Sequence, residues 1–163
     1  MTQEAITALA VELGAACKNR GWTVATAESC TGGGVGEAIT RVAGSSVWFD
    51  RGFITYSNDA KVDLLGVRQE TLGADGAVSE AAAREMARGA LHQSNAALAV
   101  AVTGIAGPDG GSATKPVGLV WFAWAKLSGE VQSRFEIFGG DRAAIREQAV
   151  REALRGLVAS TVE

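Results

Sequence analysis

The chain has 163 residues, of which 47% are hydrophobic and 20% are charged, and its formal net charge is −3. This length and composition fit one globular domain, residues 1–163, with a sizeable core. The chain has no excess of basic residues, so we do not expect it to bind nucleic acid through the phosphate backbone. No apolar run is long enough to cross a membrane. We therefore expect no nucleic-acid partner and no membrane association.

The cysteine and histidine content excludes several kinds of site. Cys17 and Cys30 are the two cysteines and His92 is the one histidine. That set cannot make a disulfide framework or a site of several His and Cys ligands, so we expect no metal and no cofactor. The N-terminal segment carries Glu4 and Glu12 in a helical pattern rather than a signal peptide. A cytoplasmic location follows as the expectation.

Helices and strands alternate through the first half of the chain. Apolar residues at helical spacing predict an amphipathic helix that Gly21 ends. A bend at Gly52 is one alternative for the strand region. In chain order we expect an amphipathic helix, a buried strand, a helix opened by a glycine run, a strand region and a short helix, at residues 3–19, 22–27, 32–41, 47–56 and 57–65.

The second half predicts a helix, a central strand, a glycine-rich loop, a β-hairpin and a final helix. Ser79 is the expected N-cap of the first of these helices, and Asp141 of the last. Ser128-Gly129-Glu130 has the length and chemistry of a hairpin turn. The expected elements lie at residues 79–93, 97–104, 105–116, 117–127 with 131–138, and 142–159. The whole pattern predicts an α/β fold, a single layered domain with a mixed β-sheet and helices on both faces.

The stretch ESCTGGG, residues 28–34, stands where a strand passes into a helix. In open α/β sheets, ligands gather at the carboxyl ends of strands. Ser29 is a candidate nucleophile, and the amides of Cys30, Thr31, Gly32 and Gly33 are candidates for holding an oxyanion. Two alternatives remain open at this point. Ser29 or Thr31 could be a helix cap, and Cys30 could be the reactive atom.

Lys61 falls in the first turn of the short helix if Asn58 is its N-cap. A cation there meets the positive end of the helix dipole, which lowers a lysine pKa, and burial lowers it further. A neutral lysine can accept a proton from a serine, as in Ser-Lys pairs. Tyr56, the one tyrosine, could orient the site or donate a proton. A solvated lysine and a strand-end tyrosine are the alternatives.

Two further loops offer groups for a substrate. The loop that begins at Thr103 contains Gly104 and Gly107, whose backbone could cradle a phosphate or a sugar, although it lacks the spacing of a P-loop. Arg142 stands at the start of the final helix, where a phosphate would be well received. An ordinary turn and a surface arginine are the alternatives.

Five stretches together resemble the CinA C-terminal domain family, in the same order over nearly the whole chain. They are TAESCTGG, GFITYSNDAK, AVTGIAGPDGG, KPVGLVWFA and FGGDRAAIR. Characterised members of that family are nicotinamide-nucleotide amidohydrolases. The resemblance implies hydrolysis of nicotinamide mononucleotide, a small-molecule substrate, to nicotinate mononucleotide and ammonia, in pyridine nucleotide recycling. The chain is too short to include the N-terminal domain of the two-domain members, so a stand-alone deamidase is expected.

The resemblance also implies roles for individual residues. The nucleophile falls on Ser29 and the base on Lys61. Tyr56, Thr103 and Arg142 fall on positions associated with substrate binding or with support of the site. A non-catalytic nucleotide-binding module linked to competence or DNA damage is the alternative function, and a cysteine-dependent amidase using Cys30 is a third.

A homo-oligomer is expected from the hairpin. Trp121 and Trp124 stand three apart in one strand, so they point to opposite faces. One of them could lie against a partner chain, or both could be buried under elements of the same chain.

Overall fold

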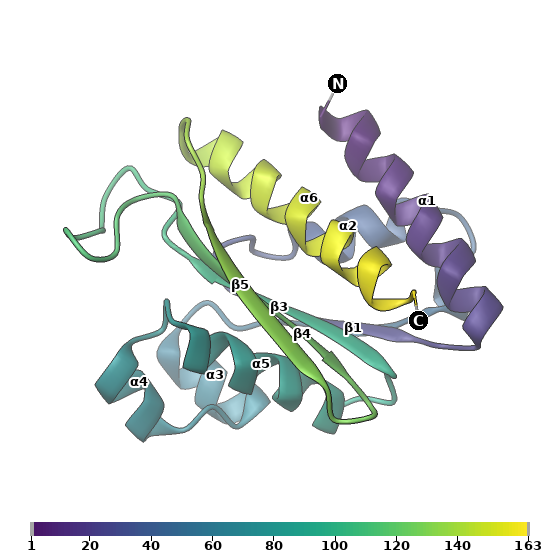
Figure 1. The fold of residues 1–163 in the computed structure, drawn as a ribbon, viewed down its shortest axis with the longest axis horizontal. Coiled ribbons are helices and arrows are strands. Elements are labelled where there is room, and N and C mark those ends of the chain that lie inside the picture. Colours follow the sequence, from purple (N-terminus) through teal and green to yellow (C-terminus); the bar gives the residue numbers. More distant parts are fainter. Residues whose placement is uncertain (1, 163) are drawn as a thin grey trace.

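The computed structural model describes residues 2–162, which form a five-stranded mixed sheet with helices on both faces (Figure 1). In sheet order the strands are β2 (Phe49–Ile54), β1 (Val24–Glu28), β3 (Leu98–Gly104), β4 (Leu119–Lys126) and β5 (Val131–Ile137). Strands β2, β1 and β3 are parallel, whereas β4 is antiparallel to both β3 and β5. The predicted fold class, the hairpin and the central place of β3 are confirmed.

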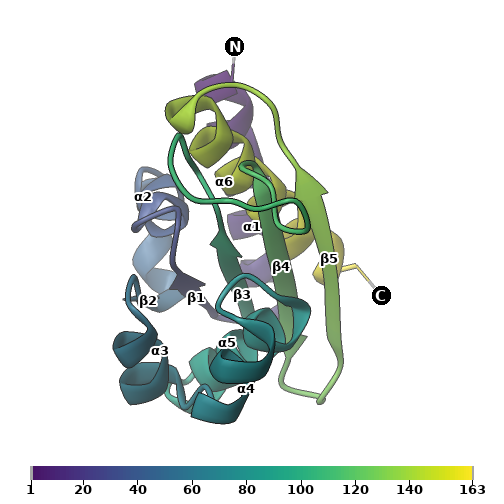
Figure 2. The same cartoon turned by 90° about the vertical axis from the view of Figure 1, so that its left-hand side faces the viewer.

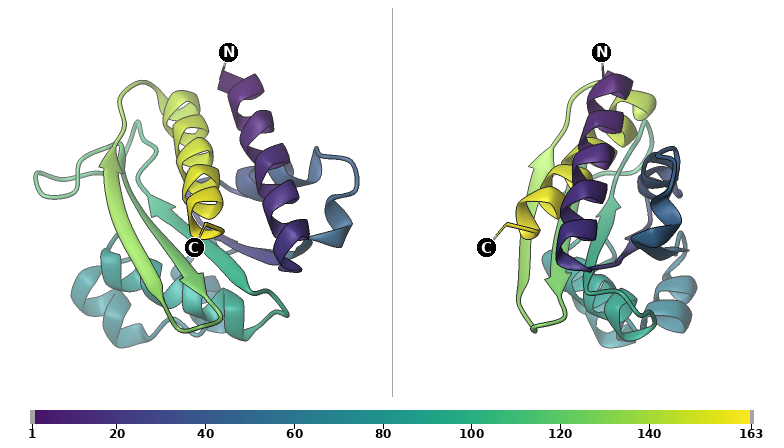
Figure 3. Two further views of the ribbon diagram at one scale, coloured as in Figure 1. Left: turned by 45° about the vertical axis from the view of Figure 1, so that its right-hand side comes forward. Right: turned by 90° about the vertical axis from the view of Figure 1, so that its right-hand side faces the viewer.

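The helices form two layers. Helices α1, α2 and α6 cover one face of the sheet, with α1 and α6 side by side (Figure 3), and α3, α4 and α5 cover the other (Figure 1). Their bounds are α1 (Thr2–Arg20), α2 (Gly34–Thr40), α3 (Asn58–Leu65), α4 (Gln69–Asp75), α5 (Glu80–His92) and α6 (Arg142–Ser160), with a 3₁₀ turn at Ser45–Val47. The side chains of Ser79 and Asp141 cap α5 and α6 as predicted.

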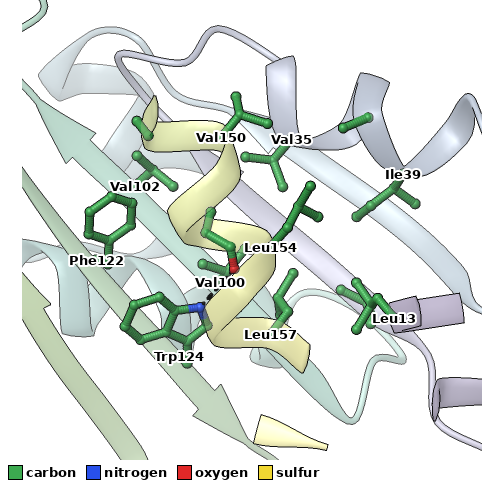
Figure 4. Close-up of a cluster of buried hydrophobic side chains, with 14 of the residues drawn as sticks. Leu13, Val35, Ile39, Val100, Val102, Phe122, Trp124, Val150, Leu154 and Leu157 are labelled. Atoms are coloured by element: carbon green, nitrogen blue, oxygen red, sulfur yellow. Dashed lines mark hydrogen bonds between the residues drawn. The ribbon is translucent and has the colours of Figure 1, made fainter. Parts of the chain in front are cut away.

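Alternation along β3 divides the core into two unlike halves. Val100 and Val102 belong to the cluster under α1, α2 and α6, whereas Ala99 and Ala101 belong to the cluster under α5. Successive strand residues face opposite sides of a sheet, which produces this division. The small alanine side chains let α5 pack close to the sheet. Large branched and aromatic side chains fill the other half (Figure 4).

The two hairpin tryptophans both find their contacts inside the chain. Trp124 is buried under α6, and its indole N–H donates to the carbonyl oxygen of Ala153 at 3.0 Å (Figure 4). Trp121 packs on Phe135 of the neighbouring strand, with ring centroids 5.1 Å apart. They point to opposite faces, as predicted, and neither requires a partner chain to cover it.

The structure decides one local feature that the sequence left open, and it adds one helix that was not predicted. Strand β2 continues through Gly52 without ending there. A glycine stands at this position because a Cβ would lie 2.5 Å from Thr26 Oγ1 on the neighbouring strand. Helix α4 was not predicted, since its short sequence has little apolar periodicity. Glu85 of α5 holds its start, because that carboxylate accepts hydrogen bonds from the Arg68 amide at 2.9 Å and the Thr71 hydroxyl at 2.6 Å.

Candidate active site

Ser29 and Thr55 directly follow the carboxyl ends of the neighbouring parallel strands β1 and β2. Figure 2 shows these two strands with α3 and α6 on either side. Glu28 pairs with Ile54 in the register of β1 and β2, so the residues that follow them are neighbours. The Ser29 amide donates to the Val102 carbonyl at 2.9 Å, and the Thr55 amide donates to the Glu28 carbonyl at 2.8 Å. The sheet therefore fixes the backbone of both residues.

Lys61 of α3 reaches this edge from the other layer. Its Nζ lies 3.0 Å from Ser29 Oγ and donates to the Thr55 carbonyl oxygen at 2.8 Å. The Lys61 side chain is buried, with 1% of its surface exposed, and Ser29 is 8% exposed. The structure thus brings together the predicted nucleophile and base, which are 32 residues apart in the sequence.

The surroundings of Lys61 favour the neutral amine. Burial penalises the charged form and holds its pKa below the ordinary lysine value, while the nearby Cys30 acts in the opposite direction and more weakly. Within residues 2–162 no carboxylate forms an ion pair with Lys61. The N-cap of α3 is Ser57 rather than Asn58, so Lys61 lies one residue further into the helix than predicted. Desolvation is therefore the main cause of the lowered pKa.

The Cys30 thiol is about as buried as Ser29, but its pKa makes it a different kind of group. Only 6% of Cys30 is exposed, and burial raises the pKa of its thiol to about 12. A thiol with that pKa is protonated near neutral pH, and the thiolate is the nucleophilic form. Cys30 is therefore a poor nucleophile where it lies.

Glu28, which the sequence analysis did not single out, holds the loop after Ser29. Its carboxylate accepts from the Thr31 hydroxyl at 2.5 Å and from the amides of Gly33, Val35 and Gly36 at 3.1, 3.0 and 2.9 Å. The start of α2 is thus filled by a carboxylate of the chain itself. The signal in the sequence was an acidic residue at the end of an otherwise apolar strand.

The glycine amides of this loop are largely engaged inside the chain. The Gly32 amide donates to the Ser29 carbonyl at 3.0 Å, and the Gly33 amide donates to Glu28. Within the described residues, no oxygen accepts from the amides of Cys30 and Thr31. The amides open to an oxyanion are therefore fewer than the predicted set from Cys30 to Gly33.

Arg146 is a second residue that the sequence analysis missed. Its Nε donates to the Cys30 carbonyl at 3.1 Å, and its Nη2 donates to the Thr31 carbonyl at 3.3 Å. These two bonds tie the backbone of the loop to α6. Arg146 lies one helical turn after Arg142, and this spacing was the available signal.

Arg142, Tyr56 and Gly107 meet beside the Ser29–Lys61 pair. Arg142 Nη1 donates to the Gly107 carbonyl at 2.8 Å, and its Nη2 donates to the Tyr56 hydroxyl at 3.0 Å. Tyr56 directly follows Thr55, whose carbonyl binds Lys61. Tyr56 is 61% exposed and Arg142 is exposed as well, whereas Gly107 is buried.

Thr103 and Gly104 have partners that explain them structurally. The Thr103 hydroxyl donates to the Ala77 carbonyl at 2.8 Å, which ties the end of β3 to the segment before α5. A Cβ at Gly104 would lie 2.8 Å from the Leu119 carbonyl on β4. Both residues hold the glycine-rich loop in place.

Residues 2–162 contain neither a metal-ligand cluster nor a membrane-spanning helix. No group of three or more His, Cys, Asp or Glu side chains there could hold a metal ion. None of the helices in that range combines the length and the apolar character that a membrane span needs.

Comparison with known proteins places the chain in a family. The model of the CinA C-terminal domain matches residues 6–161. The nicotinamide-nucleotide amidohydrolase PncC of Escherichia coli K12 is 57% identical over 157 residues, which cover 96% of this chain and 95% of that protein. PncC of Enterobacter agglomerans is 58% identical over 149 residues, 91% of each chain. The crystal structure of the competence/damage inducible protein CihA from Agrobacterium tumefaciens superposes with a TM-score of 0.94 at 52% identity, over 95% of this chain and 94% of that one. The chain belongs to the CinA C-terminal domain family.

Proposed function

We propose that this chain is a nicotinamide-nucleotide amidohydrolase, which hydrolyses nicotinamide mononucleotide to nicotinate mononucleotide and ammonia in pyridine nucleotide recycling. The reaction class and the substrate follow from the relatives named PncC, which match nearly all of this chain. The observation that carries the chemistry is the 3.0 Å contact between the buried Lys61 Nζ and Ser29 Oγ. Such a contact suits an amine that activates a hydroxyl for attack on an amide.

The first half of the proposed reaction forms an acyl-enzyme. Neutral Lys61 donates one N–H to the Thr55 carbonyl, and its lone pair accepts the Ser29 hydroxyl proton. Ser29 Oγ attacks the carboxamide carbon, and the oxyanion receives hydrogen bonds from the free amides of Cys30 and Thr31. The C–N bond then breaks, and the proton held by Lys61 goes to the leaving nitrogen, so ammonia departs.

In the second half of the reaction, water is the nucleophile and Ser29 is the leaving group. Water attacks the ester carbon of acyl-Ser29 and loses a proton to neutral Lys61. The C–O bond to Ser29 breaks, and Lys61 returns the proton to Ser29 Oγ. The product leaves as the carboxylic acid, which releases a proton to solvent to give the nicotinate carboxylate, and the enzyme is restored.

The substrate phosphate is assigned to the group formed by Arg142, Tyr56 and Gly107. Arg142 uses one N–H on each Nη for the Gly107 carbonyl and the Tyr56 hydroxyl, which leaves its other N–H groups to bind phosphate oxygens. The Tyr56 hydroxyl accepts from Arg142, so its own proton is free to be donated to the substrate. The side chains of Arg142 and Tyr56 are exposed, as the charged end of a nucleotide requires.

Ammonia release from nicotinamide mononucleotide tests the proposal. We expect Ser29→Ala to lower kcat by roughly 10³-fold or more, the scale found for a nucleophile. Ser45→Ala is the matched control, since Ser45 is also 8% exposed and lies in the 3₁₀ turn. Full turnover by Ser29→Ala would contradict the proposed nucleophile. Binding of the nucleotide by wild type without ammonia release would favour the alternative, a non-catalytic module linked to competence or DNA damage. The Agrobacterium relative is named a competence/damage inducible protein.

Three broader features are part of the same proposal. A cytoplasmic location is supported by two free cysteines, Cys17 and Cys30. A stand-alone domain is supported by the match over nearly the full length of the PncC relatives. Homo-oligomerisation is supported by the edge strand β5, where Phe135 and Ile137 are more than half exposed. Light scattering during gel filtration measures the subunit number.

A further inference from the structure

Glu28 is a buried carboxylate that accepts hydrogen bonds from four groups of its own chain. Only 1% of it is exposed, and four donors surround its two oxygens. Three of them are backbone amides at the start of α2. Among the described residues, no Lys, Arg or His forms an ion pair with it. Oriented amides and a hydroxyl therefore stabilise this charge in place of a cation.

The carboxylate closes the loop that carries Ser29. Glu28 is the last residue of β1, so the sheet fixes its backbone, and its side chain reaches forward to Thr31 and to α2. Gly32 and Gly33 lie inside the closed loop with φ of +58° and +102°. Glycines in this region are conformationally permissive, so the backbone alone does not hold the turn in one shape. The Glu28 bonds supply that constraint.

The groups that the proposed reaction needs lie inside the same loop. Ser29 directly follows Glu28, and the free amides of Cys30 and Thr31 come next. Glu28 holds the far side of the loop through Thr31, while Arg146 holds the two carbonyls from α6. The direction of the two free amides therefore depends on the bonds to Glu28.

We propose that Glu28 is a positioning residue, which sets the orientation of the Ser29 hydroxyl and of the Cys30 and Thr31 amides and does not touch the substrate. This inference rests on the proposed amidohydrolase function. It also predicts that the start of α2 takes no part in phosphate binding, because the chain's own carboxylate occupies it.

Glu28→Gln is the main test, because it keeps the shape of the side chain. One oxygen becomes an NH₂ group, which cannot accept the hydrogen bonds made to that oxygen. We expect kcat to fall on the order of 10- to 100-fold, as for a reacting group displaced by about 1 Å, while KM stays within about threefold. The rate at which a fluorophosphonate labels Ser29 falls in parallel.

Two further variants separate positioning from a general loss of stability. Glu152→Gln is the matched control, since Glu152 is also a buried glutamate but pairs with Arg134 of β5 and Arg155 of α6. We expect its kcat and labelling rate to equal those of wild type, whatever happens to its melting temperature. Thr31→Val removes one of the four donors and should lower kcat less than Glu28→Gln does. In the double variant Glu28→Gln/Thr31→Val, the fold-decrease in kcat should be smaller than the product of the two single decreases.

The outcomes distinguish this inference from the proposed function. Wild type that labels at Ser29 but releases no ammonia overturns the function, and the labelling rates then decide the role of Glu28. Wild type that turns over, with Glu28→Gln equally fast in kcat and labelling, overturns the inference alone. Equal losses in Glu28→Gln and Glu152→Gln also overturn it, since they indicate a structural role. Wild type that does neither overturns both.

Discussion

Lys61 is buried beside two uncharged partners, and this placement makes its proton sensitive to pH. Its side chain contacts Ser29 Oγ and the Thr55 carbonyl. Burial lowers its pKa from the ordinary 10.5. If the neutral amine is the base, kcat rises with pH as Lys61 loses its proton, with a midpoint below 10.5. A pH–rate profile checks this, and an activity that falls over that range would contradict it.

The same residue predicts a pH-dependent stability. Between the lowered folded pKa and the unfolded value of 10.5, the unfolded chain binds more protons than the folded one. The free energy of unfolding therefore rises with pH across that window and loses this contribution as the pH falls. Urea denaturation of wild type and Lys61→Met isolates the effect, because their difference should shrink where Lys61 is neutral in both states. Lys61→Met should also lower kcat by roughly 10²- to 10⁴-fold.

Cys30 offers a clear test between two nucleophiles. Its thiol is buried, with a pKa raised to about 12, so it carries no charge at neutral pH. We expect Cys30→Ala to keep at least about a third of the wild-type kcat, since the proposed role of residue 30 is that of its backbone amide. A loss of several hundredfold, with Ser29→Ala still active, would instead favour the cysteine-dependent amidase.

At the scale of elements, the contact between α3 and α5 positions Lys61. A Cβ at Gly89 of α5 would lie 1.9 Å from the Leu65 carbonyl at the end of α3. We expect Gly89→Ala to displace α3, to lower the free energy of unfolding by about 1–3 kcal/mol and to lower kcat as well. Chemical denaturation and the ammonia assay measure the two effects.

Gly73 of α4 provides the control for that substitution. It is also a helical glycine, but nothing lies within 4 Å of the Cβ that would be added. Gly73→Ala should leave kcat unchanged and raise the free energy of unfolding by up to about 1 kcal/mol. If both variants lose activity equally, the contact of Gly89 with α3 does not position Lys61.

Helix α6 connects two parts of the site across the chain. Arg142 in its first turn binds the loop after β3 and the residue after Thr55, and Arg146 one turn later binds the nucleophile loop. Both arginines emerge from one rigid helix that is packed on the core by Leu154 and Leu157 (Figure 4). The distance between the proposed phosphate site and the nucleophile is therefore set by a single element.

At the scale of the whole molecule, a ligand at the sheet edge would join segments from both helical layers. Lys61 comes from the layer of α3 and α5, whereas Arg142 and Arg146 come from the layer of α6 (Figure 2). A ligand that binds only the folded chain at about 100 times its Kd adds about 2.7 kcal/mol to stability. For a chain of this size we expect a rise in melting temperature of roughly 5–10 °C.

Thermal unfolding of Ser29→Ala with nicotinamide mononucleotide measures this shift without turnover. Nicotinamide alone and ribose 5-phosphate alone are the controls, and each should give a smaller rise because each reaches only part of the site. An unchanged melting temperature with the full nucleotide at millimolar concentration would contradict the proposed substrate.

Local sequence patterns determined the elements of this protein and named two of its central side chains. Apolar periodicity, Ser79 and Asp141 as caps, and the turn at 128–130 predict helices, strands and a hairpin that the structure confirms. These features depend on residues a few positions apart, which a sequence displays directly. The motif around Ser29 and the unusual place of Lys61 were visible for the same reason.

Only the tertiary structure decided how these groups act together. The Ser29–Lys61 contact spans 32 residues, and the contact between Arg146 and Cys30 spans 116. The order of the strands and the packing of α3 and α6 produce both, and no local pattern encodes them. Glu28 is a further example. Its role depends on three backbone amides at the start of α2 that donate to its carboxylate, and only the folded structure shows these bonds.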